Sequence, residues 1–288
     1  MIEPEDYPNT AKKLKQYLEG QMLSSISIGE RGIYAELLIE HIINFSRTDI
    51  LLDKPIQNIT SLKSVFTESL ERINKNEPIQ YILGNTEFYG RQFVVNSNVL
   101  IPRPETEELV NLIIQENDAP NLKVLDIGTG SGCIPITLFH ELNNPEVATL
   151  DVSKSALQVA KLNAEQNQSN VSFHACDILK ERIPNPPYNI IVSNPPYIPN
   201  HEKGLMHDNV LKYEPASALF VEDSEPLVFY KRIADLAAKS LTDGGKLYLE
   251  INEKFGGQVK AILKEEHFHD VVIVRDMQGK DRMARGVF

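Results

Sequence analysis

Residues 190–198, Ile-Ile-Val-Ser-Asn-Pro-Pro-Tyr-Ile, combine a planar amide and an aromatic ring on a stiff backbone. The apolar run Ile190–Val192 predicts a buried strand, which must end at the two prolines because proline cannot donate to a sheet ladder. Asn194 and Tyr197 then lie at the carboxyl end of the strand, where open α/β sheets bind ligands. An amide and a ring held in this way suit a planar nitrogen substrate. Taken alone, the stretch is also compatible with a proline-rich loop.

A glycine-rich sequence follows another predicted strand: Asp126-Ile127-Gly128-Thr129-Gly130-Ser131-Gly132. Glycines let the backbone approach a ligand closely, and the next helix presents its N-terminus. The spacing departs from the dinucleotide pattern G-x-G-x-x-G, because the third glycine comes one residue early and Cys133 takes its place. Asp126 would repel a pyrophosphate, but it could attract the amino group of an amino-acid-bearing cofactor, either directly or through water.

Two further acids follow the next two predicted strands. Asp151 ends the second strand and can accept hydrogen bonds from both hydroxyls of a ribose. Asp177 follows the third strand and is placed to accept one from an adenine amino group. Any single aspartate could instead cap a helix. Together with the glycine loop, the three acids fit S-adenosylmethionine better than NAD.

The elements that must position these residues alternate between strand and helix from residue 122 onward. This alternation predicts an α/β fold with a mostly parallel sheet and helices on both faces. The expected strands are Leu122–Ile127, Val147–Asp151, Val171–Ala175, Asn189–Ser193, Lys246–Ile251 and Val271–Arg275, with helices that include Ser153–Glu165, Ser224–Ser240 and Gly257–Glu266.

The chain before this region predicts two smaller parts. Residues 1–76 have apolar residues at helical spacing and predict a small helical domain, with core positions at Leu14, Tyr17, Leu18, Ile33, Leu37, Leu38 and Ile42 and a third helix over Leu62–Ile73. Residues 77–104 are rich in β-branched and aromatic residues between glycine and proline, and they predict a linker containing a β-hairpin. Pro104 begins a helix with acids in its first turn.

Composition narrows the class of protein. The 288 residues are 42% hydrophobic and 24% charged, as in an ordinary globular protein. The net charge of −11 argues against broad binding to phosphate backbones. Cys133 and Cys176 lie in apolar segments and predict core residues, with no metal site and no disulfide. The chain shows no signal core and no apolar run of membrane-spanning length, so we expect a soluble, cytoplasmic monomer.

These motifs carry a family resemblance. Asp126–Gly132 resembles motif I of class I (Rossmann-like) S-adenosylmethionine-dependent methyltransferases, and Asn194–Tyr197 resembles the motif of enzymes that methylate exocyclic or amide nitrogen. From about residue 78 to the C-terminus the chain resembles the peptide chain release factor N5-glutamine methyltransferase family, PrmC or HemK, in the further stretches Pro78–Gly84, Ile101–Glu107, Ser193–Ile198 and Tyr213–Pro215.

The resemblance implies an activity and a division of labour. It implies methyl transfer from S-adenosylmethionine to the side-chain amide nitrogen (N5) of the glutamine in the Gly-Gly-Gln loop of class 1 release factors, leaving S-adenosylhomocysteine. Residues 1–76 would recognise this protein substrate, and residues 105–288 would form the methyltransferase domain. No membrane or nucleic-acid partner is expected.

The resemblance also assigns residues. Cofactor contacts fall on Asp126, Ile127, Gly128, Thr129, Gly130, Asp151, Asp177, Ile178 and Asn194, and substrate contacts on Asn194, Pro195, Pro196 and Tyr197. Two stretches depart from the family. Many members carry an aromatic residue at the position of Ile178, and the usual Gly-Asp-Gly-Leu before a late helix is replaced by residues 222–227.

A mechanism follows from the groups. The amide nitrogen of glutamine is a poor nucleophile because its lone pair is delocalised, so the site must aim and polarise it. The side-chain oxygen of Asn194 and the backbone carbonyl of Pro195 can accept its two hydrogens, and Tyr197 can pack against the amide plane. Residues 194–197 contain no histidine or carboxylate, so we expect no strong general base. His201 and His207 are the alternative candidates for that base.

Three other interpretations stay open. The first is a nucleic-acid methyltransferase acting on adenine N6 or guanine N2, because the same motif serves flipped bases. The second is a non-enzymatic scaffold that binds the cofactor. The third concerns Gly256-Gly257-Gln258, which could mimic the methylated substrate loop, although we expect it to lead into the last long helix.

Overall fold

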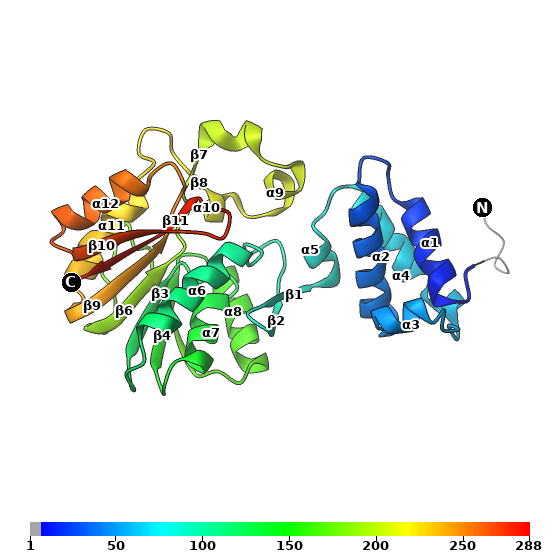
Figure 1. Cartoon of the computed structure of the whole chain (residues 1–288), viewed down its shortest axis with the longest axis horizontal. Helices are drawn as coiled ribbons and strands as arrows, with labels where there is room; N and C mark the ends of the chain where they lie inside the picture. The colour runs from blue at the N-terminus through cyan, green and yellow to red at the C-terminus, as the bar shows by residue number, and fades with distance from the viewer. Residues whose placement is uncertain (1–6) are drawn as a thin grey trace. The chain divides into compact units, whose positions relative to one another are not determined.

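The computed structural model describes residues 7–288, which divide into two compact units (Figure 1). The first unit is the chain up to Gly84 together with Asp208–Tyr213. The second consists of Asn85–His207 and Glu214–Phe288. No helix of the described chain is both long and apolar enough to cross a membrane.

The first unit is helical. Its elements are α1 (Ala11–Gln21), α2 (Ile28–Ile43), α3 (Arg47–Leu51), α4 (Ile59–Asn74), α5 (Ile79–Leu83) and α9 (Asp208–Tyr213). Capping boxes begin α2 and α3, with Ser27 and Glu30 at one and Ser46 and Asp49 at the other. The unit has its own core, which includes Leu14, Leu18, Leu38, Ile39, Phe66, Leu70 and Ile73.

The structure confirms the three helices predicted before residue 76, with some differences. The helix α3 was not predicted, because five residues are too few to show a period. Ile33 was expected in the core but is 55% exposed. Residues 1–6 of the predicted helical domain lie outside the described residues.

The predicted linker contains the expected hairpin, formed by β1 (Asn85–Phe88) and β2 (Arg91–Val94). Tyr89 and Gly90 make its turn with φ of 50° and 72°, which matches the two positive values that a type I′ turn requires. The preceding residues form α5, which was not predicted. Ile79 and Tyr81 of this helix are buried, so packing overrides their β propensity.

The second unit is built on a seven-stranded sheet in the order β10-β11-β9-β6-β3-β4-β5. Its strands are β3 (Lys123–Ile127), β4 (Glu146–Asp151), β5 (Val171–Ala175), β6 (Tyr188–Ser193), β9 (Leu241–Glu250), β10 (His269–Arg275) and β11 (Asp281–Val287). Only β11 runs against its neighbours, among the strands the structure describes. The chain leaves β3 toward β5 on one side and returns through β6 on the other, so the order reverses between β3 and β6.

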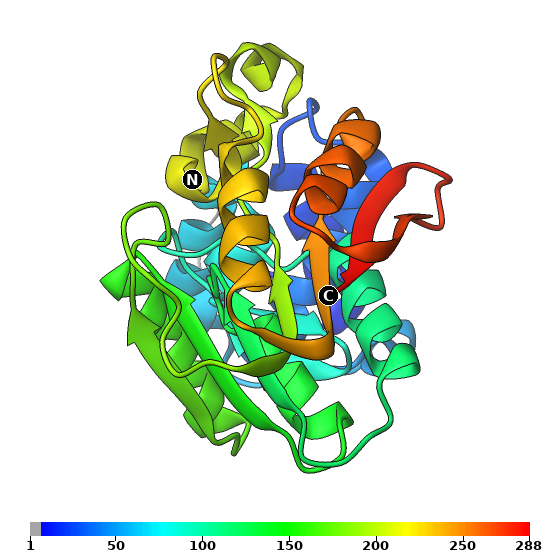
Figure 2. The same cartoon turned by 90° about the vertical axis from the view of Figure 1, so that its left-hand side faces the viewer.

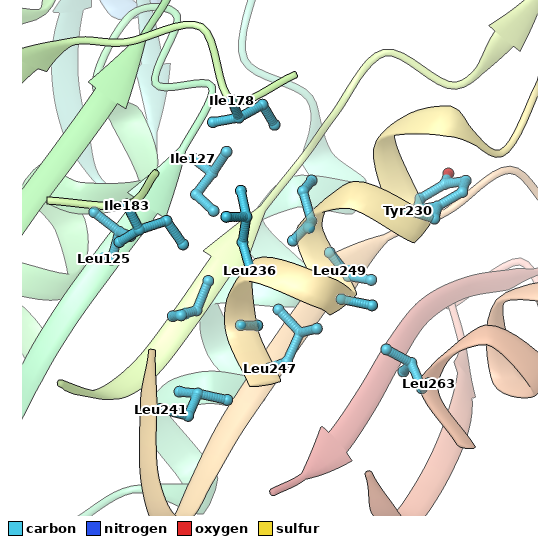
Figure 3. Close-up of a cluster of buried hydrophobic side chains, with 14 of the residues drawn as sticks. Leu125, Ile127, Ile178, Ile183, Tyr230, Leu236, Leu241, Leu247, Leu249 and Leu263 are labelled. Atoms are coloured by element: carbon cyan, nitrogen blue, oxygen red, sulfur yellow. The ribbon is translucent and has the colours of Figure 1, made fainter. Parts of the chain in front are cut away.

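Helices cover both faces of this sheet. On one face lie α6 (Pro104–Glu116), α7 (Cys133–Glu141) and α8 (Lys154–Gln166), which contribute to a core with Val124 and Val192. On the other lie α11 (Val228–Ala238) and α12 (Gly256–Glu265), seen in yellow and orange in Figure 2. Figure 3 shows this second core, where Leu247 and Leu249 of β9 pack with Leu236 of α11. Alternate residues of each strand therefore serve opposite cores.

The sheet confirms the predicted fold class and all six predicted strands, with corrections at the C-terminal end. The strand β11 was missed because charged residues and a glycine interrupt its apolar pattern. The strand β9 starts five residues before the predicted Lys246. The helix predicted over Ser224–Ser240 is shorter, because turns occupy the residues around Pro226 before α11 begins.

A segment of short elements lies between β6 and α11. It contains β7 (Ile198–Pro199), a 3-10 helix over Asn200–Leu205, α10 (Ala216–Leu219) and β8 (Phe220–Val221) in the second unit. The strands β7 and β8 pair in parallel. The segment thereby returns the chain to the sheet edge where β6 ends.

Candidate active site

A cavity of about 500 Å³ lies in the second unit at the carboxyl ends of β3, β4, β5 and β6. Its wall takes residues from the loop after each strand, including Gly128, Asp151, Asp177 and Asn194. The point where the strand order reverses is where open α/β sheets bind ligands. The fold therefore brings together at one cavity four of the segments that the sequence singled out.

The loop after β3 approaches the cavity through backbone that only glycine adopts readily. Gly128 and Gly130 have φ of 81° and 52°, and both line the cavity. Gly132 has a different role, because a Cβ there would lie 3.0 Å from Ile136 and 3.1 Å from Ala160. Its absent side chain lets α7 and α8 pack closely beneath the loop.

Asp126 is completely buried at the end of β3 and is not part of the cavity wall. Its Oδ2 accepts a hydrogen bond of 2.7 Å from the Thr149 hydroxyl. Its Oδ1 makes no hydrogen bond of ordinary geometry in the described chain, although the Thr129 hydroxyl is near enough to lower the pKa of the carboxyl group. Burial raises the pKa of Asp126 to about 7, more than the bond from Thr149 lowers it. Such a carboxyl group has an unused acceptor directly below the glycine loop.

Asp151 lies at the carboxyl end of β4 and lines the cavity. Its Oδ2 accepts a hydrogen bond of 3.0 Å from the Gly130 backbone N–H, and its Oδ1 accepts one of 2.8 Å from Ser153. Burial raises the pKa of Asp151, and these backbone donors lower it. The carboxylate still has capacity to accept from a ligand hydroxyl at the cavity.

Asp177 and Ile178 follow β5, and both line the cavity. Leu179 donates its backbone N–H to Asp177 Oδ1 at 3.1 Å, and Lys180 pairs with Oδ2 at 2.8 Å, which lowers the pKa of Asp177. Ile178 is buried in the core with Ile127 (Figure 3). The sequence did not single out Phe229 of α11, whose aromatic ring also lines the cavity.

Residues of the Asn-Pro-Pro-Tyr stretch divide between the cavity and the protein interior. Asn194, Pro195 and Pro196 line the cavity. Tyr197 does not belong to the cavity wall that the structure describes. Its hydroxyl donates a hydrogen bond of 3.1 Å to Glu250 Oε1 at the end of β9. The Ser193 hydroxyl donates one of 2.7 Å to the Ile127 carbonyl, which ties the end of β6 to the end of β3.

Sequence reasoning missed two residues that contact or adjoin this stretch, of which Thr106 also lines the cavity. The Thr106 hydroxyl, in the first turn of α6, lies 3.2 Å from Asn194 Nδ2 and 2.6 Å from Glu250 Oε2. Glu250 is 1% exposed and Thr106 is 3% exposed. Thr106 could have been found from the sequence, because it lies within residues 101–107, a stretch that carries the family resemblance. Glu250 could not, because it appears only as the last residue of an apolar strand.

The histidines that the sequence offered as bases lie apart from the cavity wall as the structure describes it. His201 Nδ1 lies 2.8 Å from Asp223, and the histidine side chain is 66% exposed. His207 is exposed as well. Gln258 lies in the first turn of α12, as expected, and its side chain is exposed.

Comparison with known proteins first defines the class. Residues 106–213 match the family model of the methyltransferase small domain, and residues 20–84 match that of the PrmC N-terminal domain. A methyltransferase from Pyrococcus furiosus shares the fold with a TM-score of 0.52 at 18% identity, over 80% of this chain and 98% of its own. The Thermus thermophilus 16S rRNA N2 G1207 methyltransferase, solved with AdoMet and guanosine, does so with a TM-score of 0.51 at 17% identity, over 70% and 49%. The fold is that of a methyltransferase.

Closer relatives then define the family. Release factor glutamine methyltransferases are 45% identical in Flavobacterium psychrophilum, over 86% of this chain and 89% of the relative, and 46% identical in Bacteroides thetaiotaomicron, over 82% and 84%. The one from Bacillus subtilis is 39% identical, over 86% and 88%. The chain belongs to the release factor glutamine methyltransferase family, which confirms the resemblance and disfavours the nucleic-acid alternative.

Proposed function

We propose that this protein transfers a methyl group from S-adenosylmethionine to the side-chain amide nitrogen of the glutamine in the Gly-Gly-Gln loop of class 1 release factors. The observation that carries the proposal is Asn194, which lines the cavity while its side-chain nitrogen faces Thr106. The side-chain oxygen is thereby available as an acceptor for an amide hydrogen. The choice of a release factor glutamine as the substrate rests on the relatives, which are release factor glutamine methyltransferases.

The residues around the cavity fit the cofactor. When bound, S-adenosylmethionine supplies an electrophilic methyl group on a sulfonium. We assign Asp126 to the ammonium group of the cofactor through its charge or a bridging water, because its carboxyl group lies outside the described cavity wall. Asp151 suits the two ribose hydroxyls, and Asp177 suits the adenine amino group. Ile127, Gly128, Thr129 and Gly130 supply backbone at the cavity wall, and Ile178 supplies an apolar surface.

The substrate amide is oriented by two acceptors on consecutive residues. The Asn194 side-chain oxygen takes one hydrogen, and the Pro195 carbonyl takes the other. Both acceptors draw electron density toward the nitrogen and fix its direction, and positioning of this kind lowers a barrier by up to roughly 7–11 kcal/mol in favourable cases. We propose that Pro196 stiffens the turn, and that Tyr197 supports it through the hydrogen bond to Glu250.

Loss of the proton needs no strong base in this proposal. Among the described residues, the only carboxylates of the cavity wall are Asp151 and Asp177, which we assign to the cofactor. The amide nitrogen becomes acidic once it is alkylated, so water can take its proton.

The remaining assignments follow from this activity. We propose that the helical domain over residues 1–76 recognises the release factor, that residues 77–104 link it to the catalytic domain, and that residues 105–288 perform the transfer. Because release factors act in translation, we place the enzyme in the cytoplasm. We propose that it works as a monomer and takes no nucleic acid as substrate.

One assay tests the function. Purified enzyme is incubated with labelled S-adenosylmethionine and, separately, with a class 1 release factor, the same factor with its loop glutamine changed to alanine, and total RNA. We expect label in the intact release factor alone. Label in RNA would support the nucleic-acid alternative, and label in the alanine variant would place the methyl group elsewhere on the protein.

A further inference from the structure

The mechanism requires the Asn194 amide to face one way. A primary amide has an acceptor end and a donor end, and only its oxygen can accept a hydrogen from the substrate. If the group turned over, its NH2 would face the hydrogens of the substrate amide and repel them. The structure must therefore contain something that selects one of the two orientations.

Thr106 makes the contact that could select it. Its hydroxyl oxygen lies 3.2 Å from Asn194 Nδ2. A hydroxyl can donate one hydrogen bond and can also accept. By itself, Thr106 could therefore donate to the amide oxygen as readily as it accepts from the amide nitrogen. The direction depends on where the single hydroxyl proton goes.

Glu250 determines where that proton goes. Its Oε2 lies 2.6 Å from the Thr106 hydroxyl, and its Oε1 lies 3.1 Å from the Tyr197 hydroxyl. An ionised carboxylate only accepts, so Thr106 must donate to it. The Thr106 oxygen is then left as an acceptor, and the group of Asn194 that faces it must be the NH2. The amide oxygen therefore points away from Thr106.

Three groups around Glu250 stabilise its ionised form, but burial outweighs them and the pKa is raised. Burial raises the pKa of Glu250, while hydrogen bonds from Thr106 and Tyr197 and the positive charge of Arg282 lower it. Arg282 is held by Asp276, which accepts a hydrogen bond of 3.2 Å from its Nε. Both carboxyl oxygens of Glu250 are occupied by donors, as a carboxylate requires. Thr106 also lines the cavity, whereas Glu250 does not belong to the wall that the structure describes.

We propose that Glu250 and Thr106 are positioning residues, which together hold the Asn194 amide with its oxygen toward the substrate. This inference rests on the proposed function, because it concerns the acceptor for the amide of the substrate. It adds a specific role for two buried residues that the motif itself does not contain. Tyr197 is hydrogen-bonded to the same carboxylate. Glu250 therefore holds Tyr197 directly and Asn194 through Thr106.

The test uses substitutions that keep shape and remove one property. Thr106→Val removes the hydroxyl, and Glu250→Gln gives Thr106 a donor in place of an acceptor, which allows the chain of hydrogen bonds to reverse. With a class 1 release factor and labelled S-adenosylmethionine, we expect each variant to lower kcat by about 30-fold or more, since the loss is one of orientation. The Kd for S-adenosylmethionine, from calorimetry, should stay within about twofold. Combining the two substitutions should cost little more than either one, since both act through Asn194.

Two controls separate positioning from packing. Thr106→Ser keeps the hydroxyl and should retain kcat within about threefold. Thr137→Val makes the same substitution at a fully buried threonine of α7, whose hydroxyl has no partner in the described chain, and should leave kcat unchanged. The inference would be wrong if the Thr106→Val and Glu250→Gln variants had the same kcat as an active wild type. It would also be wrong if their affinity for the cofactor fell in proportion to kcat. A wild type that leaves the loop glutamine unmethylated would instead overturn the proposed function.

Discussion

Glu214 accepts a hydrogen bond of 3.1 Å from the backbone N–H of Ile101, 113 residues earlier in the chain. Its other carboxyl oxygen pairs with the guanidinium of Arg103. The Glu214 side chain is 1% exposed. One buried carboxylate thus joins residues 101–107 to residues 213–215, two of the stretches that carried the family resemblance. Both stretches contribute to the cavity wall, through Arg103 and Pro215.

Glu214→Gln should destabilise the protein and weaken cofactor binding at the cavity wall. The substitution keeps the shape but leaves the Arg103 cation without its counter-charge in a partly buried place. We expect the free energy of unfolding to fall by about 1–3 kcal/mol, and KM for S-adenosylmethionine to rise about fivefold. Urea unfolding and initial-rate kinetics measure the two effects. The matched control is Glu146→Gln, because Glu146 is 73% exposed and lies 3.7 Å from Lys123. Its cost should stay below about 0.5 kcal/mol, and equal costs for the two variants would contradict the role of Glu214.

Most of the parallel half of the sheet was predictable because β3, β4 and β6 are largely buried. The edge strand β5 is only partly buried and was found from its place in the alternation of strands and helices. Val171–Ala175 was predicted to the residue. The antiparallel strand β11 was not predicted, because pairing with β9 and β10 holds it in the sheet while charged residues and a glycine interrupt its apolar pattern. The short helix α5 shows the same limit. Its burial against other helices decides its conformation, and sequence patterns do not record that contact.

The candidate site was predictable where its residues follow strands along the chain. Strand ends share one edge of the sheet, so the order of the strands along the chain was enough to place Gly128, Asp151, Asp177 and Asn194 together. Thr106 and Glu250 could not be placed in this way, because their importance lies in contacts across 88 and 144 residues. The orientation of Tyr197 toward Glu250 was unpredictable for the same reason.

Asn194→Ala should nearly abolish methyl transfer. It removes the side-chain acceptor while leaving the Pro195 carbonyl and the glycine loop in place. We expect kcat to fall by about 10³-fold, as when a positioned catalytic hydrogen-bonding group is lost, and Kd for S-adenosylmethionine to stay within about threefold. Single-turnover assays with release factor and calorimetric titration measure these quantities. Turnover comparable with the wild type at saturating cofactor would refute the assigned role.

Asp151→Ala should weaken the binding of S-adenosylmethionine. The carboxylate that we assign to the ribose disappears, and the Gly130 N–H loses its acceptor. We expect Kd for S-adenosylmethionine to rise about 100-fold, equivalent to roughly 3 kcal/mol, with kcat at saturating cofactor within about threefold of the wild type. Asp235→Ala removes an acid of α11 that pairs with Arg232 and Lys239 and should leave Kd unchanged. An unaltered Kd for Asp151→Ala would remove this residue from the cofactor site.

The stability of the free enzyme should depend on pH through Asp126. Its pKa is about 7 in the folded protein against 3.8 for an ordinary aspartate. Below about pH 4 the Asp126 carboxyl group is protonated in both the folded and the unfolded state, so it does not lower the free energy of unfolding. As the pH rises from about 4 toward 7, the unfolded state loses this proton more readily than the folded state, and stability decreases. Asp126→Asn should accordingly match the wild type in acid and exceed it at pH 8 by about 2–4 kcal/mol. Urea unfolding across this pH range measures the difference, which disappears if Asp126 titrates normally.

Cofactor binding should also depend on pH through Asp126, but in the opposite direction: affinity should increase as the pH rises. An ammonium placed beside Asp126 favours its charged form, so binding at pH 6 should release a proton from the carboxyl group. We expect affinity for S-adenosylmethionine to increase by up to about tenfold between pH 6 and pH 7, and calorimetry in buffers of different ionisation enthalpy should detect the released proton. Asp126→Asn should bind more weakly and without this pH dependence. If wild type and Asp126→Asn gave parallel affinity profiles, the ammonium would lie elsewhere, and the unpartnered oxygen of Asp126 would need another ligand.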